Sequence, residues 1–220
     1  VVLSVFSGPA FVVADLVSWC CRPLRLPVIA VLHGGNLPGF EARHARWVRR
    51  VLDRAQVVVT PSAYLAAEVV AARGRALVIP NVVDLDAYEY VPRTSPDPSL
   101  LWMRTFHHLY NPSMAVRVLD RLRRTVPDVS LTMAGQDKGA LDETKIEAEH
   151  RSLGGAITFP GFLDADQKRR ALAEHDIYLH TNHVDNAPVS VLEAAASGLV
   201  IVATAVGGIP WLLEDGISAL

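Results

Sequence analysis

The sequence predicts an α/β fold made of two doubly wound domains, each a parallel sheet covered by helices. Short runs of apolar, often β-branched residues alternate with amphipathic stretches along the whole 220-residue chain. The runs are continuously apolar, which is typical of parallel strands buried on both faces. The alternation stops once, at a proline-rich stretch near the middle of the chain. We therefore expect two domains joined by a linker.

The first half of the chain is expected to form four strands. Their residues are 1–6, 27–34, 56–61 and 76–81. The opening stretch is apolar enough to suggest a membrane span, but Gly8, Pro9 and Asp15 interrupt it. A strand followed by a buried helix is the better prediction. Residues 42–55 then have the spacing of an amphipathic helix.

The second half is expected to form five strands, with helices at 111–126 and 164–176 between them. The strands are 100–106, 129–135, 156–161, 177–181 and 200–205. A cluster of prolines marks the boundary between the halves, at Pro92, Pro96 and Pro98. We assign residues 1–88 to a partial N-terminal domain, 89–98 to a linker and 99–220 to a partial C-terminal domain.

Composition excludes some classes of protein and bounds the rest. Half of the residues are hydrophobic, and the formal net charge of -2 gives no basic face for nucleic acid. The two cysteines, Cys20 and Cys21, are adjacent, so they predict core thiols in a reducing cytosol rather than a disulfide or a metal site. The chain begins without Met inside a predicted strand and ends just after a short helix signal. We expect a piece of a longer protein, truncated at both ends.

A short apolar helix after the loop at Asp185 is the most informative stretch. Pro188 suits its first turn, which places the N-cap at Asn186 or Ala187, and Gly198 suits its end. The amides at the start of such a helix can bind an anion. Those amides belong to Val189, Ser190 and Val191.

Two carboxylates bracket the start of that helix. Glu193 lies about one turn, roughly 5 Å, beyond Ser190 on the same face. A diphosphate on the helix would place a ribose diol near Glu193 and a hexose near Asp185, because carboxylates accept hydrogen bonds from vicinal hydroxyls. The alternative is that Asp185 is a capping acid and Glu193 a solvated helix residue.

Other candidates lie where strands end, because doubly wound domains bind ligands at the carboxyl ends of their strands. His33 follows the second expected strand, and Gly34 and Gly35 after it let backbone approach a ligand closely. A lone histidine at such a place is also compatible with a structural role. Gly135 and Lys138 follow a strand of the second half, and there the alternative is a surface lysine.

Four stretches together resemble glycosyltransferase family 4, the retaining enzymes of GT-B fold. They are "DNAPVSVLEAAASGLVIVATAVGGIP" at 185–210, "HGGN" at 33–36, "IPNVVDLDAY" at 79–88 and "GQDKG" at 135–139. The resemblance covers nearly the whole chain. It implies two Rossmann-like domains, with the N-terminal domain on the acceptor side and the C-terminal domain binding a nucleotide sugar.

The resemblance also implies roles for individual residues. In the family, two acids eight positions apart contact the transferred sugar and the ribose, and Asp185 and Glu193 hold those positions here. Arg104 matches an arginine that binds the donor diphosphate. The lysine that usually follows five residues later is replaced by Leu109, and Lys138 is the substitute we consider. His33 matches a histidine that faces the sugar.

We expect no metal. Asp84 and Asp86 form an Asp-x-Asp pair, a weak signal at the expected domain junction. Charge neutralisation is therefore expected from Arg104 and helix amides. The arginines of residues 42–55 are compatible with peripheral contact to a membrane surface, the alternative being a solvated helix face.

The expected function is a hexosyltransferase-like transfer of sugar from a nucleoside diphosphate sugar to a hydroxyl acceptor, with retention and without a metal or other cofactor. The acceptor, whether carbohydrate, lipid or small molecule, is not specified by the sequence. A sugar-nucleotide epimerase of the same fold and a non-catalytic fragment that binds sugar nucleotide are the alternatives. We expect a cytoplasmic protein, with the membrane surface as the peripheral possibility.

Overall fold

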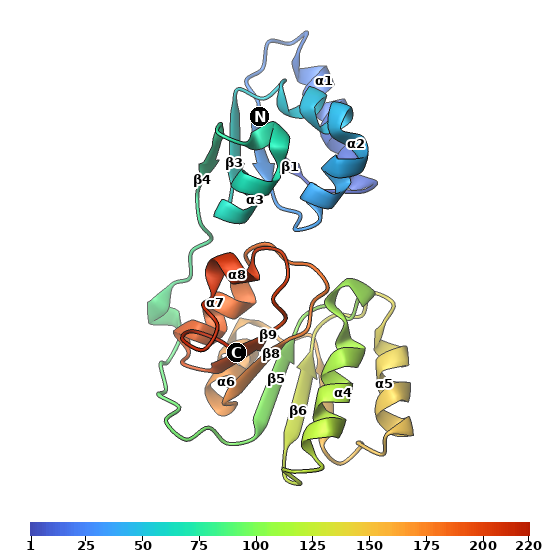
Figure 1. The fold of residues 1–220 in the computed structure, drawn as a ribbon, viewed down its shortest axis with the longest axis vertical. Helices are drawn as coiled ribbons and strands as arrows, with labels where there is room; N and C mark the ends of the chain where they lie inside the picture. Colours follow the sequence, from blue (N-terminus) through green and yellow to red (C-terminus); the bar gives the residue numbers. More distant parts are fainter. The chain divides into compact units, whose positions relative to one another are not determined.

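The computed structural model describes all 220 residues and divides into two compact units (Figure 1). The first unit comprises Val1–Asn81, Val184–Ala187 and Val206–Leu212. The second comprises Val82–His183, Pro188–Ala205 and Leu213–Leu220. Each unit is described by itself.

The first unit is built on a four-stranded parallel sheet in the order β1-β2-β3-β4. The strands are β1 (Val2–Val5), β2 (Ile29–Leu32), β3 (Val57–Thr60) and β4 (Ala76–Val78). The helices are α1 (Ala10–Cys21), α2 (Leu37–Leu52), α3 (Ala63–Glu68), the 3-10 turn η1 (Val70–Ala72) and α8 (Ile209–Leu212). The opening stretch forms a strand and a helix as the sequence predicted, but the helix is only partly buried, because Val13, Leu16 and Trp19 are exposed. No helix in the protein is long and apolar enough to cross a bilayer.

Helices α1 and α2 pack through an aromatic cluster with one carboxylate beside it. The rings of Phe11 and Phe40 have centroids 5.0 Å apart, and Trp47 meets the Phe11 ring edge-on at 4.9 Å. The carboxylate of Asp15 accepts hydrogen bonds from the Trp47 indole (2.6 Å) and from Arg54 (2.6 Å). Burial by itself raises the pKa of Asp15, but these two hydrogen bonds and nearby arginine charges outweigh it and lower that pKa.

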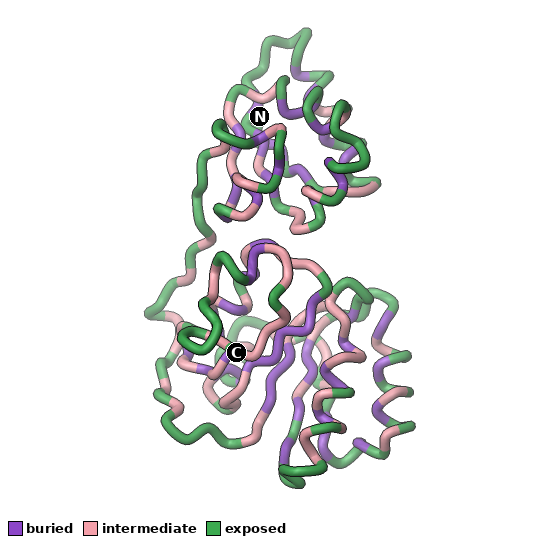
Figure 2. The backbone as a smooth tube through the Cα atoms, viewed as in Figure 1, coloured by how far each residue is buried: buried purple, intermediate pink, exposed green.

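The second unit contains a five-stranded parallel sheet in the order β7-β6-β5-β8-β9. The strands are β5 (Ser99–Met103), β6 (Ser130–Ala134), β7 (Ile157–Gly161), β8 (Ile177–His180) and β9 (Val200–Ala203). The helices are α4 (Pro112–Leu122), α5 (Leu141–His150), α6 (Ala165–Glu174) and α7 (Val189–Ala196), with 3-10 turns η2 (Leu85–Ala87) and η3 (His108–Tyr110). Figure 2 shows that the central strands are mostly buried while α4 and α5 alternate buried and exposed positions.

The strand order of the second unit reverses at β5. From β5 the chain winds through β6 to β7 on one side, then returns to β8 and β9 on the other. The segments that follow β5 and β8 therefore leave the same edge of the sheet in opposite directions. Such a switch point is where doubly wound domains bind ligands. Arg104 follows β5, and α7 follows β8.

Arg93 ties the proline-rich segment to the second unit. Its side chain is 3% exposed and forms an ion pair with Asp176 at 3.2 Å. The guanidinium also donates to five backbone carbonyls, those of Val91, Leu172, Ala173, His175 and Ser197. Four of these carbonyls, all but that of Val91, lie at the ends of α6 and α7, so one cation satisfies groups that the helices leave unpaired.

His180 is the last residue of β8, and its side chain is 1% exposed. Burial, together with the charge of Arg104, lowers the pKa of His180 to about 4. The folded protein therefore keeps this imidazole neutral over a pH range in which the unfolded chain takes up a proton. The contribution to stability is full above the ordinary histidine pKa and is lost as pH falls toward 4.

Replacing Arg93 with Met should lower the free energy of unfolding by about 3 kcal/mol or more, because Asp176 and several carbonyls lose their partner. Urea unfolding measures the change. The matched control is Arg121→Met on α4, an exposed arginine without a side-chain partner, which should change stability by less than about 0.5 kcal/mol. Equal effects of the two substitutions would contradict the role given to Arg93.

Lowering the pH from about 7 to about 4 should reduce the free energy of unfolding by on the order of 3 kcal/mol through His180 alone. The His180→Gln variant, which cannot titrate, should show a correspondingly shallower dependence of the unfolding free energy on pH. Urea unfolding at a series of pH values gives both curves. Parallel curves for the two proteins would show that this histidine does not titrate as its burial implies.

Candidate active site

Helix α7 begins one residue later than predicted. Pro188 was expected within the first helical turn, with the N-cap at Asn186 or Ala187, but its ψ of 119° is extended and it is itself the N-cap. The N-cap Pro188 offers no side-chain hydrogen bond to the helix. The helix ends at the C-cap Ser197, and Gly198 follows with a φ of +79°, as expected for a glycine after a helix.

The start of α7 presents backbone and hydroxyl donors. Val189 and Ser190 occupy the first two helical positions, whose amides have no acceptor within the helix. Val191 was expected to be free as well, but its amide donates to the Pro188 carbonyl at 3.1 Å. The Ser190 hydroxyl is buried and has no hydrogen-bond partner. The α7 terminus can therefore offer two amides and one hydroxyl to an anion.

Glu193 is buried within a small charged cluster rather than solvated. Its side chain accepts a hydrogen bond from the Tyr88 hydroxyl (2.7 Å) and pairs with the Lys168 ammonium. Burial raises the pKa of Tyr88, and the Glu193 carboxylate raises it further. Burial lowers the pKa of Lys168, but Glu193 outweighs that effect, so the net shift is upward. Lys168 is therefore held as a cation.

Arg104 follows β5 at the switch point of the sheet. Its guanidinium stacks on the Tyr110 ring at 4.4 Å, and its amide donates to the Ala134 carbonyl at 3.1 Å. Gly135 lies directly against this backbone, because a Cβ at that position would lie 1.8 Å from the Arg104 carbonyl oxygen. Glycine is thus required here by close packing between the segments that follow β5 and β6.

A cavity of about 240 Å³ lies at this edge of the sheet. It is lined by Met103, Arg104, Thr105, Ala134, Gly135, Gln136, Phe162, Leu163 and Lys168. Two cations and a mostly apolar wall are the groups that a phosphate joined to a flat ring system would need. The cavity belongs entirely to the second unit.

Lys168 is the residue that sequence reasoning missed. Lys138, the substitute considered there, is exposed and does not line the cavity. Lys168 lies in the first turn of α6, where Asp164 and Gln167 form a capping box that fixes the helix start. The sequence feature that could have identified Lys168 is its position soon after β7, at the carboxyl edge of the sheet.

The remaining candidates lie in the first unit. The His33 amide continues the sheet by donating to Val5 at 3.1 Å, and its imidazole stacks on Phe6 with centroids 5.3 Å apart. A Cβ at Gly34 would lie 3.4 Å from the Ser7 nitrogen, so this turn is tightly packed. A Cβ at Gly35 would lie 2.6 Å from the Asp185 carbonyl carbon.

The loop at Asp185 is held by its backbone. The Asp185 carbonyl accepts a hydrogen bond from the Gly208 amide at 3.1 Å, and a Cβ at Gly207 would lie 2.0 Å from the same oxygen. The Asp185 carboxylate accepts a hydrogen bond from the backbone amide of Asn186. Asn186 is buried, and its side-chain oxygen accepts a hydrogen bond from the Ser62 hydroxyl. Gly207 and Gly208 therefore allow the loop at Asp185 to lie close to their own backbone.

The Asp-x-Asp pair forms a local turn. Asp84 caps η2 by accepting a hydrogen bond from the Asp86 amide at 3.2 Å. The structure groups no three His, Cys, Asp or Glu side chains in a metal-binding arrangement.

The chain matches two family models and several curated proteins. Residues 91–220 match the model described as Glycosyl transferases group 1, and residues 5–87 match Glycosyltransferase Family 4. The glycogen synthase of Mycobacterium tuberculosis (strain ATCC 25618 / H37Rv) is 28% identical over 213 residues, 87% of this chain and 49% of that protein. The gpi3 subunit of phosphatidylinositol N-acetylglucosaminyltransferase from Schizosaccharomyces pombe is 26% identical over 143 residues, 64% of this chain and 31% of that protein. The chain thus spans about half or less of these relatives.

Solved structures give the same fold. HepE of Anabaena, in complex with UDP and glucose, superposes with a TM-score of 0.78 at 18% identity, over 99% of this chain and 63% of that chain. Sucrose-phosphate synthase from Thermosynechococcus elongatus gives a TM-score of 0.77 at 17% identity, over 100% of this chain and 59% of that chain. The predicted GT-B architecture is confirmed. Because the group 1 model covers more than half of the chain, this protein belongs to the Glycosyl transferases group 1 family of glycosyltransferases.

Proposed function

We propose that this protein transfers a hexose from a nucleoside diphosphate sugar to a hydroxyl acceptor, with retention at the anomeric carbon. The observation that carries the proposal is the buried Glu193, one turn beyond the open amides of α7 and paired to a cation that lines the cavity beside Arg104. A carboxylate, two cations and free amides within one unit match the ribose and diphosphate of such a donor.

The donor is expected to lie at the switch point of the second unit. Its diphosphate would bind the amides of Val189 and Ser190 and the guanidinium of Arg104, next to the extended Pro188. Its ribose would hydrogen-bond to Glu193. Lys168 supplies the second positive charge that the position of Leu109 lacks. Gly135 has no side chain, so its backbone can lie against that of Arg104 beside the cavity.

The sugar contacts are proposed from the resemblance to the family. Asp185 is assigned to the hexose hydroxyls, with Asn186 holding its loop, and His33 to the sugar. Gly34 and Gly35 keep the turn after His33 free of side chains. This assignment also treats the N-terminal region, residues 1–88, as the acceptor side and 89–98 as the linker.

The proposed chemistry uses no nucleophile from the protein. The bond between the anomeric carbon and the diphosphate breaks first, and the departing phosphate oxygen takes the proton of the acceptor hydroxyl, which attacks from the same face. The protein then acts by stabilising the charge that develops on the leaving group. No metal is required, because Arg104, Lys168 and the helix amides neutralise that charge. HepE, whose structure holds UDP and glucose, is a precedent for such a donor on this fold.

Arg104→Ala should lower kcat by about 100-fold or more, as removal of one preorganised charge-stabilising group does. Turnover is measured in the full-length protein, with the donor chosen by a thermal-shift screen of UDP-, GDP- and ADP-sugars. Arg121→Ala, an exposed arginine on α4, is the control and should retain full turnover. An unchanged kcat in Arg104→Ala excludes the role proposed for it.

Glu193→Gln should weaken donor binding about tenfold, because a charge-assisted hydrogen bond to the ribose is lost. Isothermal titration calorimetry with the same donor measures this. Tyr88→Phe removes a hydrogen bond to the same carboxylate but keeps the carboxylate, so its effect should be much smaller. If both variants bind donor like the wild type, the ribose assignment is wrong.

A further inference from the structure

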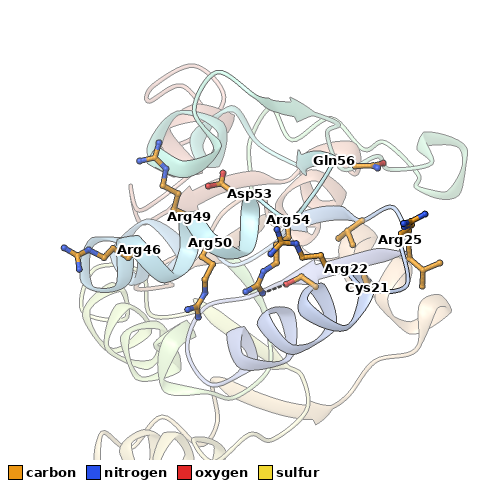
Figure 3. Close-up of a pocket in the computed structure, with 12 residues that line it drawn as sticks. Cys21, Arg22, Arg25, Arg46, Arg49, Arg50, Asp53, Arg54 and Gln56 are labelled. Atoms are coloured by element: carbon orange, nitrogen blue, oxygen red, sulfur yellow. Dashed lines mark hydrogen bonds between the residues drawn. The ribbon is translucent and has the colours of Figure 1, made fainter.

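A second, larger pocket lies in the first unit, apart from every residue assigned above. Its volume is about 780 Å³, and it lies along the boundary between α1 and α2 (Figure 3). The lining residues are Ser18, Cys21, Arg22, Arg25, Leu26, Val28, Arg46, Arg49, Arg50, Asp53, Arg54 and Gln56. Six of these twelve are arginines and one is an aspartate, so the lining carries a formal charge of +5.

Most of this charge is not neutralised within the protein. Asp15 pairs with Arg50 (3.0 Å) and Arg54 (2.6 Å), and Asp53 pairs with Arg75 (2.7 Å). The side chains of the other four arginines form no ion pair and no hydrogen bond; they are Arg22, Arg25, Arg46 and Arg49. Four unpaired guanidinium groups around one pocket repel one another, and a multiply charged anion would relieve that repulsion.

The position of the pocket within the first unit separates it from His33. Val28 and Gln56 precede β2 and β3, so the pocket lies at the amino ends of these strands. His33 follows β2 at the carboxyl end. A four-residue strand spans about 13 Å, which keeps the two edges apart. The pocket is therefore not a part of the site at His33.

Helix ends do not account for this cluster. Arg49 and Arg50 lie in the last turn of α2, where a cation is favourable against the helix dipole. Arg46 lies further into that helix, and Arg25 lies in the turn between α1 and β2, so neither benefits from it. Their presence around the same pocket is explained better by a shared ligand.

We propose that this pocket binds a multiply charged phosphate or phosphate ester. Guanidinium groups bind phosphate oxygens in bidentate fashion, and several arginines around one pocket suit a ligand with more than one negative charge. The same chemistry is offered by an anionic lipid headgroup and by a soluble polyphosphate. Helix α1, next to the pocket, exposes Val13, Leu16 and Trp19. Because apolar side chains beside basic ones suit a membrane surface, the test includes an anionic lipid.

Two probes test the proposal with the full-length protein. The first is inorganic tripolyphosphate, measured by calorimetry. The second is co-sedimentation with vesicles of equal parts phosphatidylcholine and phosphatidylglycerol, compared with phosphatidylcholine alone. We expect binding to at least one probe that weakens as salt is raised. Binding to tripolyphosphate identifies a soluble ligand, and binding only to the anionic vesicles identifies a lipid headgroup.

The variant that tests the site is the triple substitution Arg25→Gln, Arg46→Gln and Arg49→Gln. It should weaken binding to the responding probe by about tenfold or more, because three of the guanidinium groups that attract the anion are removed. The matched control removes three exposed or half-exposed arginines of the second unit that form no side-chain ion pair: Arg121→Gln, Arg123→Gln and Arg170→Gln.

The control should bind the probe like the wild type, and the test variant should keep its affinity for donor. Binding of neither probe overturns the proposal, as does an equal loss in both triple variants, since that would reflect total charge alone. Donor binding is measured separately, so failure of this pocket is distinguishable from failure of the proposed transferase function.

Discussion

The reversal of strand order at β5 is the constraint on which the second unit depends. Because β5 lies between β6 and β8, the segments that follow β5 and β8 must separate at the carboxyl edge. That separation places Arg104 and α7 at the same edge although about 80 residues of sequence lie between them. The α6 segment, which begins after β7, adds Lys168 to the same cavity. Three separate segments thus contribute to this edge of the sheet, and the strand order brings the first two of them together.

In the second unit, the buried carboxylate of Glu193 determines where a positive charge is held. A buried ionised carboxylate is unfavourable unless it is paired, and here it has both Lys168 and the Tyr88 hydroxyl. The pairing keeps the lysine charged and orders its long side chain against the cavity. We propose that Lys168 takes the place of the family's usual lysine, at the position of Leu109. Electrostatic stabilisation depends on where the charge lies in space, not on which strand supplies it.

The first unit uses the two edges of its sheet differently. The carboxyl edge has a glycine, Gly35, packed closely against the loop at Asp185, and a histidine stacked on Phe6. The amino edge collects arginines from α2 and from the turns that follow α1 and α2, beyond the number that Asp15 and Asp53 neutralise. An overall charge of -2 conceals this concentration, because the acidic residues lie elsewhere in the chain.

The sequence predicted the alternation of strands and helices, the parallel sheets and a candidate site around Glu193, since these follow from local periodicity and short-range motifs. It placed the start of α7 one residue early, because a proline suits both the N-cap and the first turn. The tertiary structure was needed to show that Glu193 is buried with Lys168, that Arg93 binds the ends of two helices, and that helix α2 and the turn after α1 bring arginines around one pocket. Each of these joins side chains far apart in the chain, and no local pattern encodes which distant segments a sheet brings together.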